Sequence, residues 1–236
     1  MLKVFLGWDS RERDAYAAAE YTLRKHASIP VSVTPLRLDR LAESGLLRRA
    51  LDRRGQMYDL PSNAPASTEF AISRFLTPIL AQTGWALFAD ADVLVMGDVA
   101  ELLNADPSKA VHVVKHDMGD VGGKKMDGQA QVAYGRKNWS SVMLFNCDHP
   151  ANKRLSLQDV QERRGFDLHQ FYWLHDSEIG ELPGEWNWLV GCQEKPASPK
   201  IAHYTLGVPS MVPDSPHAQL WWDAYREAVN GDDRSS

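Results

Sequence analysis

The sequence predicts a single α/β domain with a mostly parallel central sheet flanked by helices. The first observation is a series of short apolar runs, because strands that are buried on both faces read as continuous hydrophobic segments. The second is that these runs alternate with segments whose apolar residues recur at helical spacing. The third is size, since 236 residues without a repeat or linker fit one domain, which we place at 1–230 with a polar tail at 231–236.

The first half of the chain alternates strand and helix. Strands are predicted at 3–6, 31–36 and 85–89, and helices at 11–25, 41–51 and 68–83. Ser67 is placed to cap the third helix, and Gly84 follows its end. The stretch 52–66 is polar and contains prolines, so it is predicted to be a loop.

The second half continues this alternation around one long segment without periodicity. Strands are predicted at 110–115, 141–145 and 200–203, and helices at 152–163, 166–174 and 218–229. The glycine-rich segment 117–138 between them is unusually long for a loop, and such loops commonly serve as lids or binding loops. We expect it to cover a bound donor and exclude water, with a solvated basic loop as the alternative.

Composition excludes some partners. The formal net charge is -5, from 26 basic and 31 acidic residues, so the chain lacks the basic field that attracts nucleic acids. Two cysteines without a CxxC pair suit the reducing cytoplasm. We find no apolar run of about 18 residues and therefore expect no transmembrane segment. Peripheral membrane contact through Trp221 and Trp222 is an alternative to simple packing of the last helix.

Two aspartates follow the apolar strand at 85–89. Asp90 and Asp92 are two residues apart, so in an extended segment their side chains point the same way. Two close carboxylates repel each other unless a proton or a cation lies between them. Oxygen ligands suit Mn²⁺ or Mg²⁺, and an ion held by only a few protein groups keeps open coordination positions for a diphosphate. We therefore expect a divalent-metal site at the carboxyl end of this strand, with a simple turn cap as the alternative.

The first loop is suited to a nucleotide base by its residue types. Gly7 permits close approach to the backbone, Trp8 can stack on a ring, and Asp9 can accept a hydrogen bond from an imide or a hydroxyl. Tyr16 can add a second stacking face. A plain core position is the alternative for Trp8.

Two enzyme classes place such an aspartate pair after an apolar strand. In the haloacid-dehalogenase-like phosphatases Asp90 would be the nucleophile and Asp92 the acid/base, but their motif lies near the start of the core domain. The sequence more broadly resembles the nucleotide-sugar glycosyltransferases of the GT-A fold, in particular glycosyltransferase family 8. The blocks that carry this resemblance between Val4 and Gly207 are VFLGWDSRERDAY, FAISRFLTPIL, FADADVLVMGDVAELL and HYTLGVP.

The resemblance implies roles for individual residues. Asp90, Asp92 and His203 would hold the metal, with His203 as a neutral imidazole ligand or, alternatively, a structural histidine. Arg74 would place positive charge on the donor and take part in catalysis, unless it forms a surface ion pair with Glu69 or another acid. The residues implied in binding the nucleotide sugar are Gly7, Trp8, Asp9, Tyr16, Arg74, Asp90, Ala91, Asn138, Ser140, Ser141 and Gly207.

Two departures from the family pattern concern the reacting centre. Trp139 stands where the family has an asparagine, which is shifted here to Asn138. Leu168 stands where a glutamine lies beneath the anomeric carbon. Leucine cannot serve there, so we expect Asp167 or His169 to take part in catalysis.

These observations predict a cytoplasmic, metal-dependent glycosyltransferase. We expect it to move a sugar from a UDP-sugar to a glycan of the bacterial surface or a related hydroxyl acceptor, with retention of configuration, as the family resemblance implies. One alternative is a non-catalytic module that binds nucleotide sugars, which Leu168 suggests. The other, less favoured, alternative is a phosphatase.

Overall fold

A computed structural model of the chain describes residues 1–52, 54–117, 123–124, 130–131, 136 and 138–232. In this part of the chain a six-stranded sheet with the order β12-β8-β11-β6-β1-β2 forms the centre of the fold. Its strands are β1 (Leu2–Gly7), β2 (Val31–Leu36), β6 (Trp85–Ala89), β8 (Val111–Val113), β11 (Val142–Asn146) and β12 (Ile179–Glu181). The pairs β1–β2, β1–β6 and β12–β8 are parallel, whereas β11 is antiparallel to both β6 and β8.

Smaller sheets lie around this central one. The first combines β13 (Trp188–Leu189), β14 (Ile201–His203) and β7 (Val93–Val95); the second combines β3 (Leu51–Asp52), β4 (Tyr58–Asp59) and β5 (Ala64–Pro65); the third combines β9 (Gly123–Lys124) and β10 (Ala130–Gln131). The second sheet lies where a loop was predicted at 52–66. The predicted strand at 200–203 is present as β14, but it belongs to the first small sheet and not to the central one.

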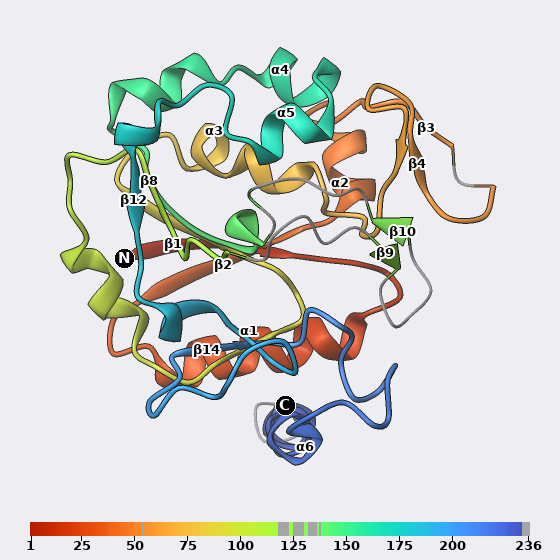
Figure 1. The fold of residues 1–236 in the computed structure, drawn as a ribbon, viewed down its shortest axis with the longest axis vertical. Helices are drawn as coiled ribbons and strands as arrows, with labels where there is room; N and C mark the ends of the chain where they lie inside the picture. Colours follow the sequence, from red (N-terminus) through yellow and green to blue (C-terminus); the bar gives the residue numbers. More distant parts are fainter. Residues whose placement is uncertain (53, 118–122, 125–129, 132–135, 137, 233–236) are drawn as a thin grey trace.

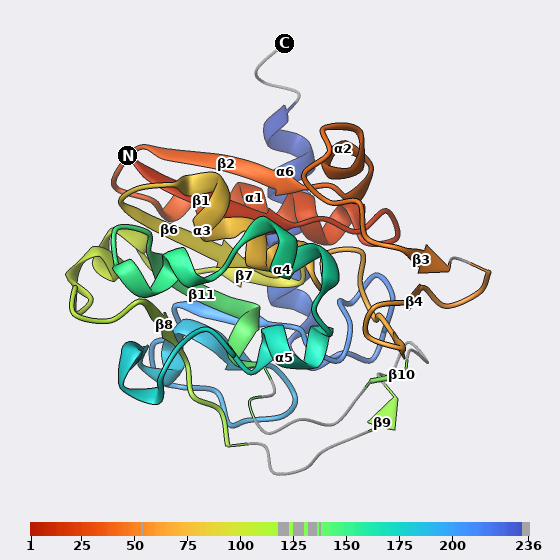
Figure 2. The ribbon, with the colours of Figure 1, turned by 90° about the horizontal axis from the view of Figure 1, so that it is seen from above.

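Helices cover both faces of the central sheet (Figure 1). The α-helices are α1 (Arg13–His26), α2 (Leu38–Glu43), α3 (Thr77–Ala81), α4 (Leu157–Glu162), α5 (Gly165–His169) and α6 (Ala218–Asp232). The 3-10 helices are η1 (Ser73–Leu76), η2 (Val99–Asn104), η3 (Trp139–Ser141), η4 (Pro150–Arg154), η5 (Asp176–Glu178) and η6 (Gly184–Asn187). Figures 1 and 2 show α3, α4 and α5 on one face and α1 on the other, with α6 packed against α1.

Strand alternation divides the apolar side chains between the two faces. Phe5 and Phe88 belong to the core under α3 to α5, whereas Val4 and Leu87 belong to the core under α1. This is the pattern expected of strands covered by helices on both sides. The predicted α/β class with a mostly parallel sheet is therefore confirmed.

The predicted helix at 68–83 is wrong in its first part, because helical structure begins only at Ser73. The backbone N–H of Glu69 donates to Asp9 Oδ2 at 3.0 Å, and Arg11 Nη2 donates to the carbonyl of Ser67 at 2.8 Å. These long-range hydrogen bonds hold the segment against the first loop. Ser67 therefore does not cap a helix.

Three further predicted helices are shorter than their apolar periodicity indicated. The helix at 41–51 is α2, which ends before Gly45; this glycine has φ 75°, a left-handed conformation that glycine adopts at helix ends. The helix at 152–163 is divided at Ser156, whose capping box with Asp159 starts α4. The helix at 166–174 ends at His169, and Phe171 follows with φ 53°.

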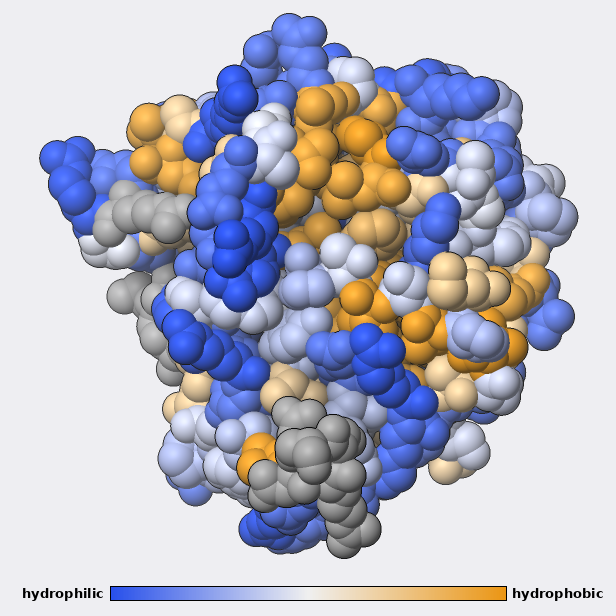
Figure 3. All heavy atoms as spheres, turned by 180° about the vertical axis from the view of Figure 1, so that it is seen from behind, coloured by the Kyte–Doolittle hydropathy of each residue, from blue (hydrophilic) through white to orange (hydrophobic). Residues whose placement is uncertain are grey.

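Within the described residues, no helix has the length and apolarity needed to cross a bilayer. Apolar side chains gather in patches among charged ones on the face opposite to that of Figure 1 (Figure 3). Trp221 of α6 lies in the core, where it stacks on Tyr225. Packing of the last helix therefore accounts for Trp221.

Candidate metal and ligand-binding site

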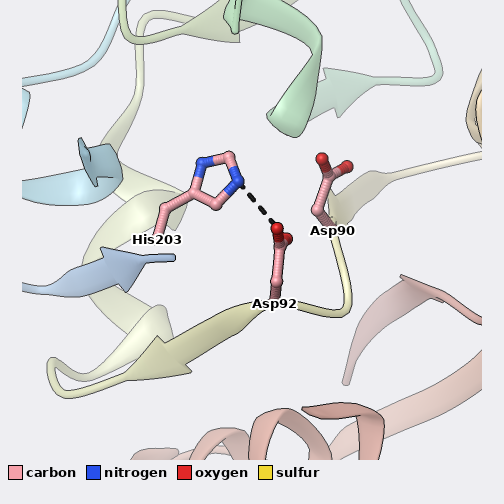
Figure 4. Close-up of side chains that lie close together, drawn as sticks. All are labelled: Asp90, Asp92 and His203. Atoms are coloured by element: carbon pink, nitrogen blue, oxygen red, sulfur yellow. Dashed lines mark ion pairs between the residues drawn. The ribbon is translucent and has the colours of Figure 1, made fainter. Parts of the chain in front are cut away.

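Asp90 and Asp92 lie in the turn between β6 and β7, beside His203 at the end of β14 (Figure 4). One ligand atom from each residue lies within 4.8 Å of those of the other two. The structure thus brings together the three predicted metal ligands. The side chains of the two aspartates point the same way because both residues lie in the turn that links two strands. They do not belong to one continuous strand.

Strand pairing brings His203 to the aspartates. β14 runs antiparallel to β7 with His203 opposite Val93, and the backbone N–H of Tyr204 donates to the carbonyl of Asp92 at 2.9 Å. His203 Nε2 lies 3.3 Å from Asp92 Oδ1, and His203 is 1% exposed. The backbone therefore sets the approach of the imidazole to the carboxylate.

Asn187 orients the imidazole of His203, and sequence reasoning missed it. The Nδ2 group of Asn187 donates to Ser141 Oγ at 2.9 Å and to the carbonyl of Asn138 at 3.2 Å. Its Oδ1 therefore faces His203 Nδ1, at 3.0 Å. This contact places the proton of a neutral His203 on Nδ1 and leaves the lone pair of Nε2 toward Asp92. In the sequence, Asn187 is marked only by its position in an aromatic-rich turn.

The donor set fits a divalent cation. An imidazole and two carboxylates are buried together, and each offers one atom that can coordinate a cation. Such groups repel unless a positive charge lies among them. Histidine and carboxylate ligands suit Mn²⁺ and, with fewer nitrogen ligands, Mg²⁺. The residues present therefore match the predicted metal.

Arg74 supplies fixed positive charge next to this cluster. Its Nη1 lies 2.8 Å from Asp90 Oδ1 and donates to the carbonyl of Ser140, also at 2.8 Å. Its guanidinium lies over the rings of Phe70 and Phe88, where cation–π attraction adds to the ion pair. The ion pair is therefore with Asp90 and is largely buried, whereas the alternative considered for Arg74 was a surface ion pair with Glu69 or another acid.

A cavity of about 240 Å³ opens beside Asp90. Predicted site residues that line it are Arg74, Asp90, Asn138, Ser140, Ser141 and His169. His169 Nδ1 lies 2.7 Å from Ser140 Oγ. Burial, together with the nearby charge of Arg74, lowers the pKa of His169 to about 3, so the ring is neutral at physiological pH.

The other residues of the predicted reacting centre lie elsewhere. Leu168 is fully buried in the core. Asp167 forms an ion pair with Arg164 at 3.1 Å and is not among the residues that line the cavity. Of the two candidates for catalysis, the structure places His169 at the cavity.

The first loop is held by contacts within the chain. Both oxygens of Asp9 accept hydrogen bonds from Arg11, and Oδ2 also accepts from the backbone of Glu69. Trp8 is half-buried, with the guanidinium of Arg37 4.5 Å from its ring centre. A Cβ on Gly7 would lie 2.6 Å from the Phe70 ring. Packing by Phe70 is therefore one reason for glycine at this position.

The remaining predicted residues are Ala91, Gly207 and Tyr16. Ala91 is fully buried between the two aspartates. Gly207 has φ 121°, and its N–H donates to the carbonyl of Tyr204. Tyr16 is half-buried on α1 and packs against the core. The lid predicted at 117–138 lies largely outside the described residues.

Comparisons with known proteins agree with this fold. No protein-family model matches the chain. Protein CDI from Arabidopsis thaliana is 40% identical over 237 residues, which cover 98% of this chain and 83% of that protein. The galactosyltransferase LgtC, solved with donor and acceptor sugar analogues, superposes with a TM-score of 0.57 at 15% identity over 95% of each chain.

Two more glycosyltransferases share the fold over only part of their own length. The match to GlyE from Streptococcus pneumoniae has a TM-score of 0.57 at 14% identity and covers 97% of this chain but 62% of GlyE. The match to the bifunctional WbbM has a TM-score of 0.58 at 14% identity and covers 94% of this chain but 51% of WbbM. These likenesses confirm the GT-A fold.

Proposed function

The chain belongs to the family of Protein CDI, and we propose that it is a metal-dependent glycosyltransferase. It would move a sugar from a nucleotide-diphosphate sugar to a hydroxyl group of a carbohydrate acceptor. The observation that carries this proposal is the cluster of Asp90, Asp92 and His203, which lies at the carboxyl end of β6 in a GT-A fold. In open α/β sheets, ligands bind at this edge.

Asp90, Asp92 and His203 would hold Mn²⁺ or Mg²⁺. Bound there, the ion would supply Lewis-acid charge for the diphosphate of the departing nucleotide. Arg74 adds a second positive charge from a planar group whose Nη1 is already oriented by Asp90 and Ser140. Because these groups are fixed before a ligand arrives, little reorganisation accompanies charge development.

The cavity beside Asp90 is the proposed site of the transferred sugar. Hydroxyl groups of Ser140 and Ser141 and the neutral ring of His169 line it. Such groups both donate and accept hydrogen bonds, as sugar hydroxyls do. The nucleotide would then lie toward the first loop, at the carboxyl end of β1, with UDP as the proposed nucleotide.

The proposed transfer proceeds with retention of configuration. The bond between the anomeric carbon and the diphosphate oxygen breaks, and the acceptor oxygen forms its bond on the same face of the sugar. The departing oxygen takes the acceptor proton, so no carboxylate base is required beneath the sugar. This route is compatible with Leu168, whose side chain is buried in the core.

Two other functions predict different results. A non-catalytic module that binds nucleotide sugars is favoured by Leu168 alone, and it would bind without turnover. The phosphatase alternative requires Asp90 as a nucleophile, but Asp90 is paired with Arg74, which lowers its nucleophilicity. The phosphatase would hydrolyse p-nitrophenyl phosphate, whereas the glycosyltransferase would not.

The test is calorimetric binding of UDP with and without Mn²⁺. The wild-type chain should bind UDP far more tightly with Mn²⁺, and Asp92→Ala should remove that dependence. Asp223→Ala, an exposed residue of α6, is the matched control and should bind like the wild type. Equal UDP affinity for Asp92→Ala and the wild type would refute the metal assignment. Release of UDP from UDP-glucose or UDP-galactose then separates the enzyme from the binding module.

A further inference from the structure

Two cavities along strands β8 and β12 share one wall and form what we call the β8 groove. The first, of about 480 Å³, is lined by His116, Lys115 and Gln193 among others. The second, of about 580 Å³, is lined by His112, Lys109 and Trp186 among others. The shared wall consists of Glu181, Leu182 and Pro183. Figure 1 shows β8 and β12 side by side.

The β8 groove begins next to the metal ligands. β6 and β8 are both antiparallel to β11, so their carboxyl ends lie at the same edge of the sheet. Asp90 follows β6 at this edge, and His116 follows β8. β8 ends at Val113, and the backbone N–H of His116 donates to the carbonyl of Val114 at 3.0 Å, so the chain turns between His112 and His116.

His116 carries a buried hydrogen-bond donor without a partner. Gln193 Oε1 accepts from the backbone N–H of Leu189 at 3.2 Å, so its Nε2 group faces His116 Nδ1, also at 3.2 Å. Nδ1 is therefore the acceptor, and the ring proton lies on Nε2. His116 is 5% exposed, and its Nε2 has no partner among the described residues.

His112 has two such nitrogens. It is 3% exposed, and neither Nδ1 nor Nε2 has a partner in the described part of the chain. Its ring occupies the space above Gly180, where a Cβ would lie 2.3 Å from His112 Cδ2. Burial lowers the pKa of His112, so the neutral ring offers one donor and one acceptor. Unpaired buried polar groups are costly, which points to a ligand that completes them.

The lining of the β8 groove indicates the class of ligand. A hydroxyl group donates and accepts at once and so matches each neutral imidazole. The acids Glu101, Asp106, Asp117 and Glu181 outnumber the lysines Lys109 and Lys115, which disfavours an anionic ligand. A neutral, hydroxyl-rich molecule fits both the imidazoles and this balance of charge.

We propose that the β8 groove binds the carbohydrate acceptor, with His112 and His116 as hydrogen-bonding partners of its hydroxyl groups. This inference rests on the proposed function, which sets the orientation of the acceptor in the groove. The end of the groove at His116 presents the acceptor to the metal site. It assigns specificity to residues that the donor site does not use. The end at His112 would take the sugar farthest from the bond that forms.

The test uses ¹⁵N-labelled histidine and the whole chain. The imidazole nitrogen resonances are followed while cellobiose, maltose, lactose and sucrose are added separately at millimolar concentrations. At least one disaccharide should shift the resonances of both His112 and His116. His112→Phe and His116→Phe keep a ring of similar shape, and each should weaken binding roughly tenfold for the hydrogen bonds lost. His26→Phe on α1 is the matched control and should bind like the wild type.

The proposal is overturned if none of the four disaccharides moves either resonance, or if both phenylalanine variants bind as tightly as the wild type. Calorimetry of UDP and Mn²⁺ on the wild-type chain tests the proposed function separately. Binding of UDP with Mn²⁺ but of no disaccharide would refute the groove alone. Binding of a disaccharide at His112 and His116 without metal-dependent UDP binding would refute the proposed function alone.

Discussion

His203 Nδ1 lies 3.0 Å from Asn187 Oδ1, and this contact selects the nitrogen that His203 presents to the two aspartates. Asn187 is itself held by Ser141 and the backbone of Asn138. The chain therefore orients a metal ligand through a buried amide, as outer-sphere partners of histidine ligands commonly do. Four segments of the fold meet in this arrangement: the turn at Asp92, η3 and its N-cap with Ser141 and Asn138, η6 with Asn187, and β14 with His203.

Replacing Asn187 with leucine should weaken Mn²⁺ binding roughly 10- to 100-fold, because His203 loses the partner that sets its tautomer and orientation. Electron paramagnetic resonance of free Mn²⁺ measures this affinity directly. Asn152→Leu is a matched control: Asn152 is also buried, but it bonds to the carbonyls of Ala110 and Asn146. It should lower stability and leave the Mn²⁺ affinity intact. An equal loss of affinity in both variants would mean that general destabilisation explains the effect.

Arg74→Lys should weaken binding of UDP with Mn²⁺ roughly tenfold. A single ammonium cannot reproduce the planar group that contacts Asp90 and Ser140. Arg74→Met should have a larger effect, since it leaves Asp90 without its cationic partner. Calorimetry gives both affinities, and the exposed Arg226→Lys serves as the control. Wild-type affinity for Arg74→Met would exclude Arg74 from the donor site.

Stability should fall as the pH decreases through the range in which unfolded histidines gain protons. Burial lowers the pKa of His116 from 6.5 to about 4. Between these values the unfolded chain binds the proton and the folded chain does not, so acid favours unfolding. The difference corresponds to about 3 kcal/mol at pH 4 and below.

Urea unfolding of wild type and His116→Phe at pH 7 and pH 4.5 measures this contribution. The variant should lose less stability between the two pH values, because it has no ring to protonate. An identical pH dependence in the two proteins would show that His116 does not contribute. His26→Phe controls for removal of a histidine from the surface of α1.

Gly7→Ala should destabilise the fold by about 1–3 kcal/mol, because the added Cβ would lie 2.6 Å from the ring of Phe70. Gly184→Ala is the matched control: a Cβ there meets no atom within 4 Å, so stability should change by less than about 1 kcal/mol. Urea denaturation gives both values. Similar stability in the two variants would show that the first loop makes room for the added Cβ without loss of stability.

Local sequence patterns account for much of the architecture and for the metal motif. Apolar runs place the strands of the central sheet, because a strand buried on both faces must be apolar throughout. Asp90 and Asp92 are recognisable as a cation site because two adjacent charges at the end of such a strand need compensation. The capping box at Ser156 and the left-handed Gly45 are equally local, although apolar periodicity alone predicted longer helices at both places.

Other features depend on contacts between segments that are distant in the sequence. An apolar run does not encode strand direction, so the antiparallel course of β11 follows from the path of the whole chain. Segment 67–72 is not helical because Asp9 and Arg11 take its backbone hydrogen bonds. Asn187 becomes a partner of His203 only through pairing of β13 with β14. The groups that hydrogen-bond to each other at these positions are far apart in the sequence. Residue propensity and spacing therefore cannot predict these contacts, because each group meets its partner only when the chain has folded.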